Sequence, residues 1–96
     1  MHAVIRNYSG KGAKELLALL QQRKAEVEQI FRSIKGFVSY AAAETDSGCF
    51  TMTICETKTS TDESVALARD WVAKNAASLG LGAPTITEGS VAIHMK

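Results

Sequence analysis

The chain has 96 residues, 46% of them hydrophobic and 22% charged, and eleven basic residues against ten acidic ones leave a net charge of +1. This length and composition predict one folded domain, residues 1–96, whose modest core would benefit from association with a second copy. The charges are balanced and interspersed, which excludes a concentrated basic surface and argues against nucleic acid as a partner.

No apolar stretch is long enough to cross a bilayer, and the residues after Met1 lack the pattern of a signal peptide. Cys49 and Cys55 lie on one predicted strand. Their separation along an extended strand is about 20 Å, too far for a disulfide. We therefore expect a cytoplasmic protein with no membrane partner and with two reduced cysteines.

Hydrophobic periodicity predicts six elements in the order strand, helix, strand, strand, helix, strand. The expected strands cover residues 2–8, 37–44, 49–57 and 86–95, and the expected helices cover residues 13–34 and 60–79. Gly36 and Gly80 are suited to stop the two helices, and Ser60 with Glu63 matches a capping box at the start of the second. Gly48 suits a positive-φ position in a hairpin loop, and Gly89 suits a bulge in the last strand.

This order is typical of an α+β ferredoxin-like sandwich, in which a four-stranded antiparallel sheet carries both helices on one face. Alternation in the last two strands predicts the helix-facing set Phe50, Met52, Ile54, Val91, Ile93 and Met95. The other face would carry Thr51, Thr53, Cys55, Ala92 and His94, together with Tyr40. Such a half-apolar face usually meets a partner: a second sheet, a nucleic acid strand or a small ligand.

The chain resembles, over almost its whole length, the dimeric α/β-barrel superfamily, in particular its small antibiotic-biosynthesis-monooxygenase-like proteins. The shared features are a first strand ending in Asn7-Tyr8, the segment 36–40, the short hairpin, and Trp71 on the second helix. The resemblance implies a homodimer in which two open sheet faces meet and close a barrel around a pocket. It also implies a cofactor-independent monooxygenase acting on a small aromatic or quinol substrate. The alternative is a non-enzymatic small-molecule-binding or scaffold dimer with no catalytic site.

Some relatives in this superfamily degrade haem with a strand-1 asparagine, a tryptophan near the second helix and a histidine shortly after it. Asn7 and Trp71 match the first two, but residues 72–84 contain no histidine. No close pair of cysteines or histidines has the spacing of a metal site either. We therefore expect neither a cofactor nor a metal ion.

Asn7 and His94 are the candidate catalytic residues. Asn7 resembles the strand-1 asparagine that holds a substrate oxygen in oxygenase relatives, whereas a plain polar residue at a strand end is the simpler explanation. His94 carries an imidazole, a side chain suited to acid–base work, although a surface histidine near the C-terminus would look the same.

Tyr40, Trp71, Thr51 and Thr53 are the candidate substrate-binding residues. Tyr40 could donate a hydrogen bond to a phenolate or quinone oxygen, or simply pack across the hairpin. Trp71 could wall a pocket, or anchor the core or a dimer interface. The two threonines are candidates because of their expected place on the open face.

Two other protein classes share this element order. RNA-recognition modules expose aromatic residues on their first and third strands, with a basic start to the third strand. Here Phe50 is in phase with the expected core face, and no lysine or arginine precedes it. Amino-acid-sensing regulatory domains, a further alternative, normally accompany a catalytic domain, and we expect none within residues 1–96.

Overall fold

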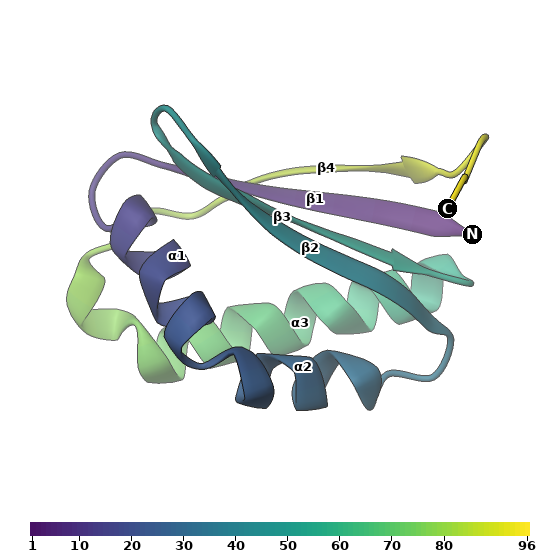
Figure 1. The fold of residues 1–96 in the computed structure, drawn as a ribbon, viewed down its shortest axis with the longest axis horizontal. Helices are drawn as coiled ribbons and strands as arrows, with labels where there is room; N and C mark the ends of the chain where they lie inside the picture. The colour runs from purple at the N-terminus through teal and green to yellow at the C-terminus, as the bar shows by residue number, and fades with distance from the viewer.

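A computed structural model describes all of residues 1–96 and has the predicted ferredoxin-like architecture (Figure 1). In chain order the elements are β1 (His2–Ser9), α1 (Ala13–Gln22), α2 (Lys24–Arg32), β2 (Phe37–Thr45), β3 (Gly48–Cys55), α3 (Lys58–Asn75), the short 3-10 helix η1 (Ala77–Leu79) and β4 (Thr85–Ser90). The strands form one antiparallel sheet in the order β2-β3-β1-β4. The helices all cover the same face of this sheet, and the other face is open (Figure 1).

The first helical segment is two helices rather than the single one expected over residues 13–34. The chain turns at Arg23, whose backbone departs from helical geometry although no glycine or proline is nearby. The Arg23 guanidinium donates hydrogen bonds to Glu26 and to Asn75 on α3. The break therefore lies where a side chain ties the first helical segment to α3.

No helix in the structure is both long enough and apolar enough to span a bilayer.

The second predicted helix begins earlier and ends earlier than expected. Thr57, not Ser60, is the N-cap: its side chain accepts a hydrogen bond from the Ser60 backbone N–H. Such a bond satisfies one of the free amides at the start of a helix. The α-helix ends at Asn75, and residues 77–79 continue as η1 before Gly80, which has a left-handed backbone with φ of 70°.

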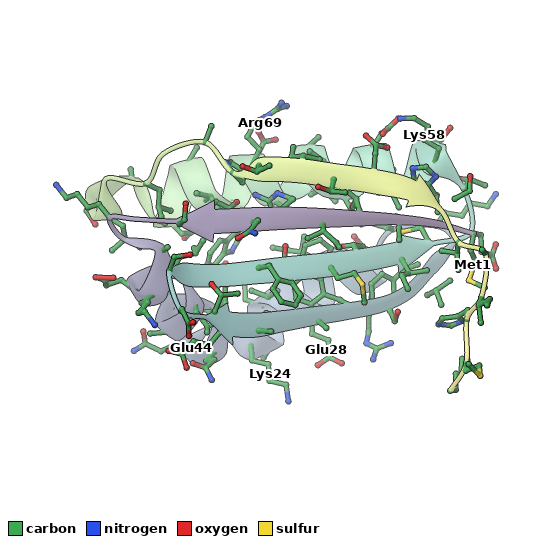
Figure 2. The ribbon with its side chains drawn as sticks, turned by 90° about the horizontal axis from the view of Figure 1, so that it is seen from above. Met1, Lys24, Glu28, Glu44, Lys58 and Arg69 are labelled. Carbon is green, nitrogen blue, oxygen red and sulfur yellow. The ribbon has the colours of Figure 1, made fainter.

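The expectations for the last strand and the hairpin need correction. β4 ends at Ser90, so residues 91–96, including His94, have no regular structure and form a tail near Met1 at one end of the sheet (Figure 2). Gly89 pairs regularly with Ala3, and the irregularity in the sheet lies instead between Phe37 and Ser39. Gly48 does not have a positive φ. It is needed because a Cβ there would overlap the Tyr8 carbonyl and the Ala13 side chain.

The two faces of the sheet are the reverse of the prediction. Cys49, Thr51, Thr53 and Cys55 are buried, and the core contains the two cysteines, so this set faces the helices. By alternation Phe50, Met52 and Ile54 lie on the other side, where Phe50 and Met52 are half-buried and Ile54 is buried. The register extends the assignment across the sheet, because Arg6 pairs with Thr51 and Tyr8 with Cys49, whereas Asn7 pairs with Phe50.

Candidate functional site

A small cavity lies between the sheet and the helices. The sheet contributes its polar floor, Arg6, Tyr8, Tyr40 and Thr51. Its apolar walls come from all three helices: Leu16, Leu20, Val27, Ile30, Phe31, Leu67, Ala68, Trp71 and Val72. The cavity has a volume of about 20 Å³, enough for one water-sized group.

Arg6 is the least expected member of this cavity because it is a cation in the interior. Only 6% of the residue is exposed. One terminal nitrogen, Nη2, donates a hydrogen bond to the Tyr8 hydroxyl, and the guanidinium carbon lies 5.2 Å from the centre of the Tyr8 ring. Its Nε has no hydrogen-bond partner, and none of the ion pairs of the protein includes Arg6. A buried charge of this kind is costly to the fold unless something pairs with it.

Two tyrosines border the guanidinium and stay neutral at ordinary pH. Burial raises the pKa of Tyr40 to about 12, although the Arg6 charge acts in the opposite direction. Burial also raises the pKa of Tyr8, again against the influence of Arg6. Both phenols therefore remain hydrogen-bond donors rather than negative partners for Arg6.

Trp71 closes the helix side of the cavity and is held in place by polar contacts at its outer edge. Its indole Nε1 donates a 2.7 Å hydrogen bond to Glu26 Oε2 on α2. The Arg23 guanidinium carbon lies 5.6 Å from the centre of the indole ring, and Arg23 also bonds to Glu26. The hydrogen bond from Trp71, followed by that from Arg23, lowers the pKa of Glu26. This cluster fixes α2 against α3 and so fixes the wall of the cavity.

An open groove of about 780 Å³ lies beside the cavity, between β2 and the first two helices. Leu20, Val27, Phe31 and Tyr40 line both spaces, so these four side chains form the partition between them. The rings of Phe31 and Tyr40 are stacked, with centroids 4.4 Å apart. Charged residues from both layers stand at the groove rim, among them the pairs Lys14–Glu44 and Arg32–Glu28.

The structure brings three of the predicted site residues together, Tyr40, Thr51 and Trp71, all on the cavity. Thr53 is buried on the same face of the sheet but does not line the cavity. Asn7 is exposed on the opposite face, where it pairs with Phe50 and Thr85. His94 is half-buried in the C-terminal tail. The catalytic roles of Asn7 and His94 therefore stay predictions, and the cavity does not include either residue.

Arg6, Tyr8 and Phe31 were not predicted as site residues. The signal for the first two was present, because Arg6 and Tyr8 are two residues apart in β1 and so share one face of the sheet. The register with β3 places this face on the helix side. Phe31 lies within the predicted first helical segment, but its stacking on Tyr40 depends on how that segment packs. The structure contains no cluster of three or more metal-ligating side chains.

Solved structures with a similar fold include the following three proteins. An uncharacterised Nitrosomonas europaea protein, NE2512, superposes with a TM-score of 0.69 at 16% identity, covering 99% of this chain and 91% of its own. The monooxygenase ActVA-Orf6 of Streptomyces coelicolor, solved in complex with nanaomycin D, gives 0.65 at 18% identity, covering 99% and 89%. A Chloroflexus aurantiacus protein assigned to the antibiotic biosynthesis monooxygenases gives 0.61 at 18% identity, covering 98% and 96%.

Neither a family model nor a curated protein sequence matches the chain. The identities to the solved structures are low, so the likeness concerns the fold. At that level it confirms the resemblance seen in the sequence: the chain has the ferredoxin-like fold of the antibiotic-biosynthesis-monooxygenase-like proteins.

Proposed function

We propose that the chain is a cofactor-independent monooxygenase that acts on a small aromatic or quinol substrate. The observation that best supports this proposal is the arrangement of the groove and the cavity. An open, partly aromatic groove of about 780 Å³ meets a buried polar cluster across the Phe31–Tyr40 stack. Ligand sites are commonly apolar hollows with a few convergent polar groups, and this place fits that description. The substrate ring would lie in the groove with its oxygen directed at Tyr40 and Arg6.

The reaction proposed is oxygenation of a phenol to a quinone by dioxygen. One oxygen atom replaces a ring hydrogen and becomes the new carbonyl. The other leaves as water, with that hydrogen and the hydroxyl proton. The substrate supplies the electrons, so the protein needs no redox group of its own. The protein's task is to position the ring, exclude bulk water and donate hydrogen bonds to the oxygen on which negative charge develops.

A homodimer through the open sheet face belongs to the same proposal. In the register, the residues of this face are Ala3, Ile5, Asn7, Ser39, Ala41, Ala43, Phe50, Met52, Ile54, Thr85, Thr87 and Gly89, and none is charged. Figure 2 looks onto this face, and the labelled charged residues lie around its margins. An uncharged face of this extent favours association with a like surface.

The two buried, free cysteines fit the expected cytoplasmic location.

The test is dioxygen uptake with 1-naphthol as the substrate, followed by an oxygen electrode and by the absorbance of the quinone product. Ala42 lines the groove and is exposed, so Ala42→Trp should fill the groove without disturbing the core. We expect uptake by the wild type and at least a tenfold loss in Ala42→Trp. Ala73→Trp, at an exposed position on α3, is the matched control and should keep full activity. Equal rates in all three proteins would contradict the proposed site.

The alternative is a dimer that binds a small molecule, or nothing, without catalysis. The cavity volume of about 20 Å³ favours it, because side chains already fill most of the interior. Under this alternative no member of a panel of phenols and quinols would increase dioxygen uptake above the protein-free rate.

A further inference from the structure

Arg6 is an interior cation without an anionic partner, and this sets the chemistry of the ligand. We propose that the site binds an acidic aromatic hydroxyl compound as its anion, with the phenolate oxygen paired to the Arg6 guanidinium. This inference rests on the proposed function for the location of the site. The cavity has room for one oxygen-sized group, so the ligand's oxygen reaches Arg6 only if its ring enters from the groove and displaces the Phe31–Tyr40 part of the partition.

The protein itself supplies no counter-ion for Arg6. The titratable groups that face it are Tyr8 on β1, Tyr40 on β2 and Cys49 on β3. Burial raises the pKa of all three, so none carries a negative charge near neutral pH. The helices contribute only apolar side chains and the Trp71 ring to this space. An anion from outside would therefore remove the largest electrostatic penalty in the interior.

The site also lacks a base that could take the proton from a neutral phenol. No aspartate, glutamate or histidine lines the cavity. The two carboxylates that line the groove are already paired, Glu28 with Arg32 at 2.8 Å and Glu44 with Lys14 at 3.3 Å. The proton must therefore go to solvent before or during binding. The site should prefer phenols and enols acidic enough to ionise near neutral pH, and binding should follow the ionisation of the ligand's own hydroxyl.

The experiment uses 4-nitrophenol, whose anion absorbs visible light whereas the neutral form does not. Titrating the probe with the wild-type protein at several pH values gives the dissociation constants of both forms. We expect the anion to bind at least tenfold more tightly than the neutral phenol, so that the bound probe ionises at lower pH than the free probe. In Arg6→Met, which keeps an unbranched side chain that is shorter than arginine and removes the charge, this preference should disappear.

Two further variants keep the test decisive. Arg69→Met removes an exposed cation from α3 and should leave the preference unchanged. Arg6→Gln, which keeps polar hydrogen-bonding groups and removes the charge, tests the same place if Arg6→Met does not fold. We expect it to lose the tenfold preference as well. Equal binding of both forms by the wild type, or an equal preference in the wild type and Arg6→Met, would overturn the proposal.

The outcome separates this inference from the proposed function. An Arg6-dependent preference for the anion without dioxygen uptake would support the ligand class and refute the monooxygenase. Uptake that is unchanged in Arg6→Met would support the monooxygenase and refute the role of Arg6.

Discussion

The two faces of the sheet differ in a way that reverses the usual expectation. The face under the helices buries polar side chains, among them Arg6, Thr51 and Thr53, whereas the open face presents Phe50 and Met52. A protein normally hides its larger apolar residues and exposes polar ones. The reversal is consistent with the two proposals, a site among the buried polar groups and a contact surface on the open face.

The helix side depends on a few large side chains, and its core should be sensitive to their loss. Trp71 is 8% exposed and joins α3 to α2 through Glu26. We expect Trp71→Ala to lower the free energy of unfolding by about 3–5 kcal/mol, the usual range for removing a buried aromatic side chain. Urea denaturation measures this. Trp71→Phe keeps one aromatic ring but loses the indole hydrogen bond and part of the buried ring system, so it should lose less, about 1–3 kcal/mol. Similar losses in both variants would mean that the retained ring contributes little to stability.

The open side should instead be sensitive to charge. Phe50 is half-buried on β3, one of the two central strands of this face. If two copies meet there, Phe50→Lys places an unpaired charge in the interface, which costs several kcal/mol and raises the dimer dissociation constant by about 100-fold or more. Sedimentation equilibrium of the 10.3 kDa chain measures the constant. Ala73→Lys, on the outer side of α3, is the control and should not change it. A wild-type monomer at all concentrations would show that the face is not a self-association surface.

The buried side of the sheet should also show itself in the pH dependence of stability, through the ionisation of Tyr40. Burial raises the pKa of Tyr40 from 10.0 to about 12, so the folded state resists its ionisation. The unfolded chain ionises first, and the contribution of Tyr40 to stability, complete below pH 10, is lost as the pH rises toward 12. We expect the free energy of unfolding to fall over this range and Tyr40→Phe to fall less steeply. The same slope in both proteins would indicate that Tyr40 is open to solvent.

The sequence was sufficient to predict the order of elements because strand and helix periods differ clearly. It was not sufficient to tell the two faces of the sheet apart. In β3 the residues Phe50 and Met52 alternate with Thr51 and Thr53, and both sets are suited to burial when both faces are covered. One local signal did point the right way: Cys49 and Cys55 are in phase with the threonines, and cysteine is among the most buried residue types.

Within the candidate site, the sequence could predict only those residues whose side-chain type by itself suggests a binding role. Tyr40 and Trp71 stand out as large amphipathic side chains, and both line the cavity. Arg6 does not stand out, because an arginine in a strand is ordinarily exposed at its head. Its burial follows from the pairing of β1 with β3, in which Arg6 lies opposite Thr51 on the helix side. Long-range register of this kind cannot be obtained from one strand's pattern.

Asn7 gives the finest test of the two faces, because it directly follows Arg6 and points the other way. A site confined to the helix side predicts that Asn7→Ala changes dioxygen uptake by less than about twofold, since the residue lies one sheet thickness away from the cavity and is exposed. A role in holding substrate oxygen predicts a large loss instead. The rates of Asn7→Ala and Tyr40→Phe, measured side by side with 1-naphthol, decide between them. A tenfold loss confined to Asn7→Ala would move the chemistry to the open face, into the space that two facing sheets would enclose.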